Sequence, residues 1–286
     1  MMVRVEAPAK INLSLDVTGR LDSGYHTVKM VLQTVSLTDT IEITPAAQLS
    51  VKVEGADLEV NEQNTAWKAV LLYSEKIGVL PHFSVTLHKR IPMQAGMAGG
   101  SADAAGVLVG LNALHDNCLS LEELCALGGK VGADVPFCIV GGTMLATGIG
   151  TDLEAIAPLP SCYIVAAKPF CGVSTAQAYA AIDTLPYPQQ THTDAVVAAL
   201  KTATISAVGD AMHNRFAEVL DIPQVETLVA ALKANGAVGA CMTGSGSAVI
   251  GLFEGKAAAD VCVNAISAQC ETAVVCRPWH GGPKVV

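Results

Sequence analysis

The feature of this sequence that most constrains its fold is a glycine-rich stretch at residues 91–105, which carries few large side chains and leads into a helix pattern. Residues 83–88 before it alternate apolar and polar, as a half-buried strand does. Apolar residues from Ala104 to Leu114 then recur at helical spacing and predict a strongly amphipathic helix. A glycine loop at a helix start suits an anion, because Gly has no Cβ and the first helical turn has unpaired N–H groups. The alternative is an ordinary tight connection between strand and helix.

The length, composition and charge of the chain limit the classes of protein to which it can belong. A chain of 286 residues is long for one core and predicts two domains. With 51% hydrophobic and 15% charged residues, it is typical of a well-buried globular protein. The net charge of -9 argues against non-specific nucleic-acid binding, which needs a basic face. No signal-peptide pattern and no uninterrupted apolar run of about 20 residues is present, so we expect a cytoplasmic protein without membrane contact.

Several familiar chemistries lack their sequence motifs. The nine Cys are an odd number, form no C-x-x-C pair and stand mostly in apolar runs, so we expect reduced core thiols and no zinc. There is no G-x-x-x-x-G-K-[ST] loop, no G-x-G-x-x-G after a strand and no H-E-x-x-H. The glycine loop therefore belongs to neither a P-loop enzyme nor a dinucleotide-binding fold.

The first half of the chain predicts a sheet with polar groups on one face. A strand at 2–6 is followed by alternation through residue 17, which puts Lys10 and Asn12 on the same polar side. The glycine-bounded loop at 19–26 displays an aromatic ring beside an imidazole. A helix at about 62–77 is expected to begin at Asn61 or Asn64 and to turn Trp67, Val70, Leu71 and Ser74 toward the core.

A single carboxylate stands out at Asp134, inside the nearly apolar stretch 131–137. A buried Asp needs a partner, because removing its charge from water is costly. The alternative is that Asp134 only caps a turn or the start of a helix.

The second half alternates helices and strands after the boundary signal Pro158-Leu159-Pro160. This is α+β content of roughly ferredoxin-like type. A second glycine loop at 242–248 lies between two predicted strands, as a hairpin turn or as a second wall of a phosphate site. The helices are expected at 193–201, 205–219, 223–235 and 256–269, and the strands at 237–243, 247–253 and 272–276.

Five motifs, in this order and spacing, resemble those of the GHMP small-molecule kinases. The resemblance implies an α+β fold of two domains. The N-terminal domain, at 1–156, would be like domain 2 of ribosomal protein S5 and would bind ATP, and the C-terminal domain, at 157–286, would be ferredoxin-like. The site would lie in the cleft between them. The motifs stand at residues 7–13, 24–26, 92–105, 132–137 and 243–247.

The first two motifs look like those of the branch that uses ATP to phosphorylate an alcohol group of a cytidine diphosphate polyol in isoprenoid precursor biosynthesis. By that resemblance, ATP phosphates lie on the glycine loop and Mg²⁺ is held mainly through phosphate oxygens; no metal-ligating residue is identified. Ala102 stands where the family pattern has a serine. For Asn64, Lys89 and Asp103 the alternative is an ordinary surface role. The ATP-binding residues implied are Asn64, Lys89, Pro92, Gly96, Gly99, Gly100, Ser101 and Asp103.

For catalysis the resemblance implies the pair Lys10 and Asp134. Asp134 would orient the attacking hydroxyl and take its proton late, since a carboxylate beside a lysine is a weak base. Lys10 would hold that carboxylate and stabilise the developing charge on oxygen.

The substrate residues implied are Asn12, Tyr25, His26, Thr175 and Tyr179. Tyr25 would stack on the cytosine, His26 would meet the base edge, and Tyr179 would close the other side of the sandwich. The alternative for Tyr179 is core packing.

Two other functions remain open from the sequence. A sister GHMP enzyme, an ATP-dependent diphosphomevalonate decarboxylase, would share the loop and the aspartate but would not need a cytosine site. A non-catalytic nucleotide- or RNA-binding module would need neither Lys10 nor Asp134, and the acidic balance of the chain weighs against RNA.

Overall fold

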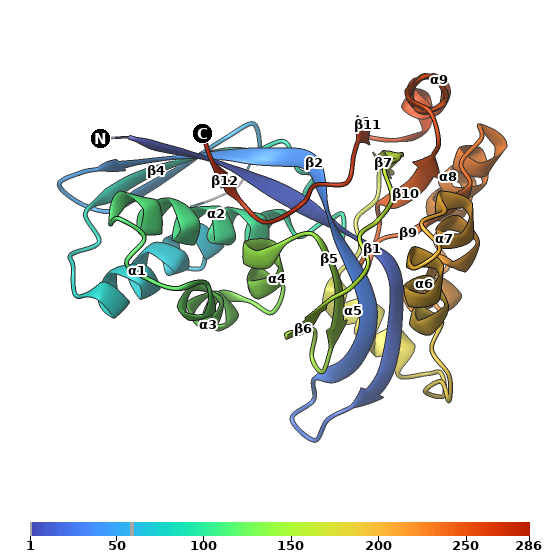
Figure 1. The fold of residues 1–286 in the computed structure, drawn as a ribbon, viewed down its shortest axis with the longest axis horizontal. Coiled ribbons are helices and arrows are strands. Elements are labelled where there is room, and N and C mark those ends of the chain that lie inside the picture. Colours follow the sequence, from blue (N-terminus) through green and yellow to red (C-terminus); the bar gives the residue numbers. More distant parts are fainter. Residues whose placement is uncertain (1, 58–59) are drawn as a thin grey trace.

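The computed structural model describes residues 2–57 and 60–286. The chain forms two sheets with helices packed against them (Figure 1). Within these described residues, no helix combines the length and apolarity that a membrane crossing needs. The strands are β1 Val3–Arg20, β2 His26–Pro45, β3 Ser50–Glu54, β4 Phe83–His88, β5 Thr143–Thr147, β6 Asp152–Ala155, β7 Tyr163–Lys168, β8 His213–Asn214, β9 Gly239–Met242, β10 Val249–Phe253, β11 Thr272–Cys276 and β12 Lys284–Val285. The helices are α1 Thr65–Ile77, α2 Gly99–Leu114, α3 Leu121–Val131, α4 Val135–Val140, α5 Thr175–Ile182, α6 Thr193–Leu200, α7 Ile205–Ala211, α8 Pro223–Ala234 and α9 Lys256–Ile266, with short 3₁₀ turns η1 Arg215–Glu218 and η2 Ser267–Gln269.

The first sheet is organised around β1 and β2, which pair antiparallel along almost their whole length. Its main path runs β12-β1-β2-β4-β3, with β5, β6 and β8 attached beside it. Helices α1 to α4 lie along one face of this sheet (Figure 1). The separate strands predicted at 2–6 and through residue 17 are one continuous strand, buried along most of its length.

Helix α2 packs directly on β1 and β2, and the prediction that it is strongly amphipathic is wrong. It is buried on nearly every side, from Ala102 to Asn112. Its small residues let it approach the sheet closely: a Cβ on Gly106 would lie 2.4 Å from Ile41 Cδ1, and one on Gly110 would lie 2.7 Å from Ile43 Cδ1. The helix that carries the glycine loop is therefore fixed rigidly against the sheet.

Helix α1 begins where one of its two predicted caps stands. The Asn64 side chain accepts hydrogen bonds from Ala66 N and Trp67 N, which satisfies two otherwise unpaired donors of the first turn. Val70 is fully buried, whereas Leu71 is 42% exposed. The prediction that Leu71 faces the core is thus wrong.

A two-residue bulge interrupts β2 and forms hydrogen bonds with the second half of the chain. Pro8 pairs with Thr38 while Ala9 pairs with Val35, so Ser36 and Leu37 have no partner on β1. Ser36 N instead donates to Arg277 O at 2.9 Å, and Arg277 N donates to Ser36 Oγ at 2.9 Å. The residues after β11 are thereby attached to the first sheet.

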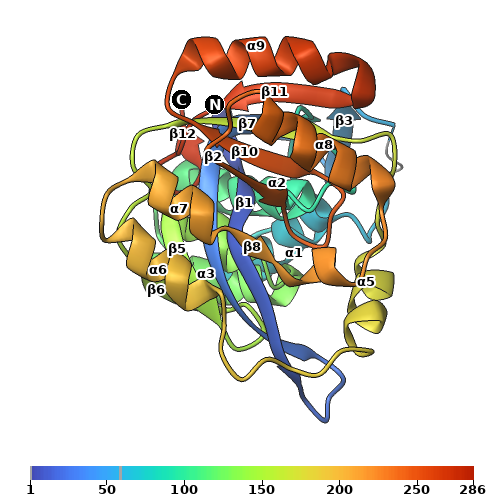
Figure 2. The ribbon, with the colours of Figure 1, turned by 90° about the vertical axis from the view of Figure 1, so that its right-hand side faces the viewer.

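The second sheet is antiparallel in the order β11-β7-β10-β9. Helices α8 and α9 pack against it, as Figure 2 shows from the side. Two short strands from this half of the chain return to the first sheet: β8 pairs parallel with β1 at Leu15, and β12 pairs with β1 at Val5. The domain boundary between residues 156 and 157 stays a prediction.

The predicted helix at 205–219 is wrong beyond Ala211. The chain leaves the helix to form β8, and the Asn214 side chain donates to Met242 O at 2.7 Å and to Gly244 O at 2.9 Å. Its Oδ1 accepts from Phe216 N at 3.0 Å and starts a 3₁₀ turn. Asn214 therefore supports the second glycine loop from behind, which a continuous helix would not allow.

Candidate active site

A cavity of about 960 Å³ opens between the glycine loop, the end of the β1–β2 hairpin and the start of α5. All predicted site residues except Asn12 line it. They are Lys10, Tyr25, His26, Asn64, Lys89, Pro92, Gly96, Gly99, Gly100, Ser101, Asp103, Asp134, Thr175 and Tyr179.

The glycine loop has the geometry of an anion site. Gln94, Gly96 and Ala98 all have positive φ, so the chain curls before α2 begins at Gly99. Ala98 provides no side-chain cap, which leaves the first N–H groups of the helix without a side-chain partner. Unpaired donors at the positive end of a long helix favour phosphate.

The second glycine loop packs against the first, and no side chain separates them. A Cβ on Gly96 would lie 2.2 Å from Thr243 O, and one on Gly244 would lie 2.6 Å from Gly96 O. Ala248 N also donates to Ala95 O at 3.3 Å. The loop at 242–248 joins two strands, and its residues 244–246 also line the cavity.

Asn12 does not line the cavity. It is buried, and its Oδ1 accepts from Lys10 Nζ at 2.9 Å and from Gly244 N at 3.0 Å. Its position joins Lys10 to the second glycine loop, so the geometry gives Asn12 a supporting role behind the site.

Lys89 and Asp103 line the cavity but are held together below its surface. Lys89 Nζ donates to the carboxylates of both Asp39 and Asp103, and all three side chains are almost fully buried. Burial alone would lower the pKa of Lys89, but the two carboxylates outweigh it and raise that pKa. Burial also raises the pKa of Asp103, whose Oδ1 has no hydrogen-bond partner among the described residues.

Asp39 is a residue that the sequence prediction missed. Its Oδ1 accepts from Arg90 N at 2.5 Å and from Ile91 N at 2.9 Å, where the chain leaves β4 for the glycine loop. Asp39 thus fixes the start of that loop. The available signal was the alternation of apolar and polar residues at 35–43, in which Asp39 takes one of the apolar positions, between Leu37 and Ile41.

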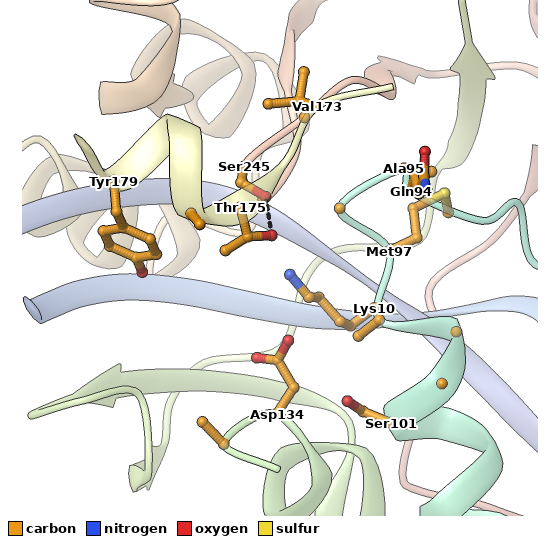
Figure 3. Close-up of a pocket in the computed structure, with 18 of the residues that line it drawn as sticks. Lys10, Gln94, Ala95, Met97, Ser101, Asp134, Val173, Thr175, Tyr179 and Ser245 are labelled. Carbon is orange, nitrogen blue, oxygen red and sulfur yellow. Dashed lines mark hydrogen bonds between the residues drawn. The ribbon is translucent and has the colours of Figure 1, made fainter. Parts of the chain in front are cut away.

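Lys10 and Asp134 extend into the same part of the cavity, with Ser101 at the start of α2 nearby (Figure 3). Asp134 occupies the N-cap position of α4 but makes no capping hydrogen bond, so its carboxylate remains available. Burial, together with the negative charge of Asp134, raises the pKa of Tyr179 to about 12. A lysine and a free carboxylate therefore face the space beside the glycine loop.

At the other end of the cavity, the aromatic side chains that line it pack against one another. The His26 and Tyr179 rings lie 4.7 Å apart at 27°, and Tyr179 meets the edge of Phe216 at 5.0 Å. Tyr25 is 65% exposed at the hairpin end. Thr175 Oγ1 and Ser245 Oγ lie 3.0 Å apart and join α5 to the second glycine loop (Figure 3). These contacts favour the packing alternative for Tyr179, since His26 covers the face that a base would use.

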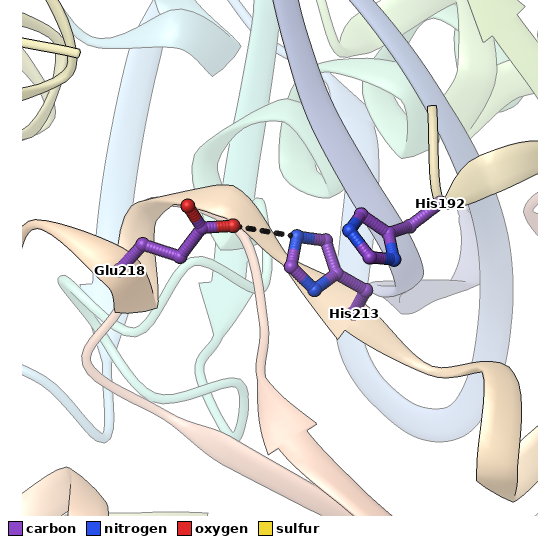
Figure 4. A group of neighbouring side chains, drawn as sticks. All are labelled: His192, His213 and Glu218. Atoms are coloured by element: carbon purple, nitrogen blue, oxygen red, sulfur yellow. Dashed lines mark ion pairs between the residues drawn. The ribbon is translucent and has the colours of Figure 1, made fainter. Parts of the chain in front are cut away.

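A histidine group outside this cavity brings possible metal ligands together. Ligand atoms of His192, His213 and Glu218 lie within 4.8 Å of one another (Figure 4). The two imidazole rings are stacked, with centroids 3.7 Å apart and planes at 22°. Imidazole binds a metal at about 2 Å in its own ring plane, and two nearly parallel planes do not meet at that distance. The group therefore ties residue 192 to β8 by stacking and does not form a metal centre in this arrangement.

A glycine loop with the geometry of a phosphate site, facing a lysine and an aspartate, is the arrangement expected of a phosphoryl-transfer enzyme of the small-molecule kinase class. Two family models match the chain: GHMP kinases N terminal domain over residues 64–142, and GHMP kinases C terminal over residues 196–272. The chain belongs to the GHMP kinase family, which confirms the predicted family and its two-domain α+β fold.

Two curated relatives match this chain in sequence over nearly its whole length. It is 40% identical over 281 residues to 4-diphosphocytidyl-2-C-methyl-D-erythritol kinase of Exiguobacterium sibiricum, covering 97% of this chain and 98% of the relative. The Bacillus cereus enzyme of the same name is 38% identical over 283 residues, 97% of each chain.

Solved structures of similar proteins have the same fold as this chain. A crystal structure of 4-(cytidine 5'-diphospho)-2C-methyl-D-erythritol kinase superposes with a TM-score of 0.82 at 32% identity, over 96% of this chain and 98% of that one. Homoserine kinase from Cytophaga hutchinsonii superposes with a TM-score of 0.75 at 20% identity, over 100% and 97%, and shows the shared fold alone.

Proposed function

We propose that this kinase transfers the γ-phosphoryl group of ATP to the 2-hydroxyl of 4-diphosphocytidyl-2-C-methyl-D-erythritol, giving the 2-phosphate and ADP, in non-mevalonate isoprenoid precursor biosynthesis. The observation that carries the proposal is identity of 38–40% to kinases of that name over 97% of this chain. The cavity supports it, because the glycine loop lies at one end and Tyr25 with His26 at the other.

The glycine loop suits the phosphates of ATP. Residues 95–100 bring backbone N–H groups and no charged side chain to the cavity. Asp103, Asp134 and Asp183 are the carboxylates that line the cavity in the described chain. Since Asp103 and Asp183 are already paired with basic side chains, we propose that Mg²⁺ is held mainly through phosphate oxygens. Bound there, Mg²⁺ neutralises charge on the phosphates.

Lys10 and Asp134 are proposed to prepare the acceptor hydroxyl. Asp134 accepts a hydrogen bond from the tertiary hydroxyl, aims its oxygen at the γ-phosphorus and takes the proton late. Lys10 uses one of its three N–H donors on Asn12 Oδ1, which fixes its ammonium group beside the reacting oxygen. In a loose transition state this positioning and charge stabilisation supply most of the catalysis.

The cytidine end of the substrate is proposed to lie against Tyr25 and His26. Tyr25 offers an exposed ring for stacking, and His26 presents a ring edge to the base. Tyr179 then supports His26 from behind, while Thr175 holds the second glycine loop through Ser245.

We further propose a cytoplasmic protein that works on these small molecules without binding nucleic acid. The nine free thiols support a reducing compartment, in which cysteines stay unpaired. The net charge of -9 supports the absence of nucleic-acid binding.

The test is a coupled assay of ADP release. We expect turnover with 4-diphosphocytidyl-2-C-methyl-D-erythritol and at least about 100-fold lower kcat/KM with mevalonate, homoserine or galactose, because those acceptors lack the cytidine. Diphosphomevalonate is assayed in parallel for CO₂ release. Turnover of diphosphomevalonate with no activity on the cytidine compound would overturn the proposal in favour of a decarboxylase.

A further inference from the structure

The carboxylate of Asp183, just after α5, holds three side chains at the cytidine end of the cavity. Its Oδ2 accepts from Arg20 at 2.9 Å, and its Oδ1 lies 2.7 Å from His26 Nε2 and accepts from Tyr187 Oη at 3.0 Å. Arg20 ends β1 and His26 begins β2. A single group thus joins both strands of the hairpin to the segment after α5.

This contact determines where the proton on His26 lies. The hydrogen bond from His26, followed by those of its other neighbours, lowers the pKa of Asp183 and keeps it ionised near neutral pH. An ionised carboxylate accepts hydrogen bonds and cannot donate them. His26 Nε2 therefore carries the hydrogen, and in the neutral ring Nδ1 is left as an acceptor.

The imidazole is also fixed in orientation. Tyr179 stacks on its face, and the His26 side chain is only 8% exposed. Asp183 holds its Nε2 edge, while Nδ1 has no hydrogen-bond partner among the residues that the structure describes. The ring thus lines the cavity with one unsatisfied acceptor.

That acceptor distinguishes the two pyrimidines. Cytosine carries an amino group at C4, which donates a hydrogen bond, whereas uracil carries a carbonyl oxygen there, which accepts one. A fixed acceptor pairs with the first and repels the second, and a buried polar group left unpaired is costly.

We infer that Asp183 is a positioning residue which fixes the tautomer of His26 and thereby makes this site select cytidine over uridine. The inference rests on the proposed function, because it places the nucleobase at His26. Asp183 itself touches no reacting atom.

The test compares CDP and UDP as competitive inhibitors against the cytidine substrate. In the wild-type enzyme we expect CDP to inhibit at about 10-fold lower concentration than UDP, from one well-placed hydrogen bond. In Asp183→Leu the ratio falls toward one, since the His26 tautomer is free. In Asp183→Asn it also falls, because the amide can donate to Nε2 and place the hydrogen on Nδ1. KM for ATP stays unchanged in both variants.

The matched control is Asp194→Asn. Asp194 is a nearby carboxylate that pairs with Lys29 and Thr191 on the surface, and its replacement leaves the CDP-to-UDP ratio as in the wild type. A thermal midpoint for each variant checks that it is folded. A wild-type enzyme without CDP preference, or an unchanged preference in both Asp183 variants, overturns the inference. Absence of any turnover of the cytidine substrate by the wild type instead overturns the proposed function.

Discussion

At the scale of single residues, the proposed chemistry rests on Lys10 and Asp134, which both line the cavity. We expect Lys10→Ala and Asp134→Ala each to lower kcat by about 10² to 10⁴-fold, because each removes charge stabilisation or proton transfer at the reacting oxygen. ATP binding should persist, since the proposed phosphate contacts come from backbone N–H groups of the glycine loop and not from these two side chains. Steady-state ADP release and calorimetric ATP titration measure the two effects. Near-normal turnover in either variant would contradict this mechanism.

Tyr25 offers a second test on one side chain. It is 65% exposed, so Tyr25→Ala should change folding stability little. Base stacking on an aromatic ring contributes about 1–3 kcal/mol, which predicts an increase in KM for the cytidine substrate of about 5- to 150-fold. KM for ATP should change far less. Equal increases for both substrates would remove Tyr25 from the nucleobase site.

At the scale of elements, the close contact between the two glycine loops should contribute to the stability of the fold and to ATP binding. Gly96 and Gly78 have φ of +71° and +72°, but a Cβ on Gly78 meets nothing within 4 Å while one on Gly96 would overlap Thr243 O. Gly78→Ala therefore measures backbone strain alone, about 1 kcal/mol. Gly96→Ala should cost clearly more in urea unfolding and should weaken ATP binding as well. Equal costs for the two variants would show that the loops can separate freely.

Elements governed by local contacts were predictable from the sequence. The Asn64 cap bonds to N–H groups two and three residues away, and the glycine loop precedes α2 directly, so both patterns are readable in one stretch. The end of α7 was not predictable in this way, because it depends on hydrogen bonds from Asn214 to carbonyl groups 28 and 30 residues away. The roles of Asp39 and Asp183 were not predicted for the same reason. Their partners Lys89 and His26 lie 50 and 157 residues away in the sequence, where no periodic pattern connects them.

At the scale of the whole molecule, the two sheets should unfold together. β8 and the residues after β11 are bonded to the first sheet, so neither half keeps its contacts when the other melts. We expect a single calorimetric transition with equal calorimetric and van't Hoff enthalpies. ATP at about 100 times its Kd should stabilise the protein by about 2.7 kcal/mol and shift that one transition upward. Two resolved transitions in the full chain would contradict this expectation.

The bulge at Ser36 and Leu37 has a mechanical consequence. Through Arg277 it anchors the end of β11 beside Ala9, and β8 anchors the same half of the chain at Leu15. Ala9 and Leu15 are six positions apart along the strand, a span of about 20 Å. Two attachments so far apart restrict opening and closing to rotation about the line that joins them. The cleft should therefore widen and narrow only by a hinge rotation about this line, and X-ray scattering should show at most a small change in the radius of gyration when substrates bind.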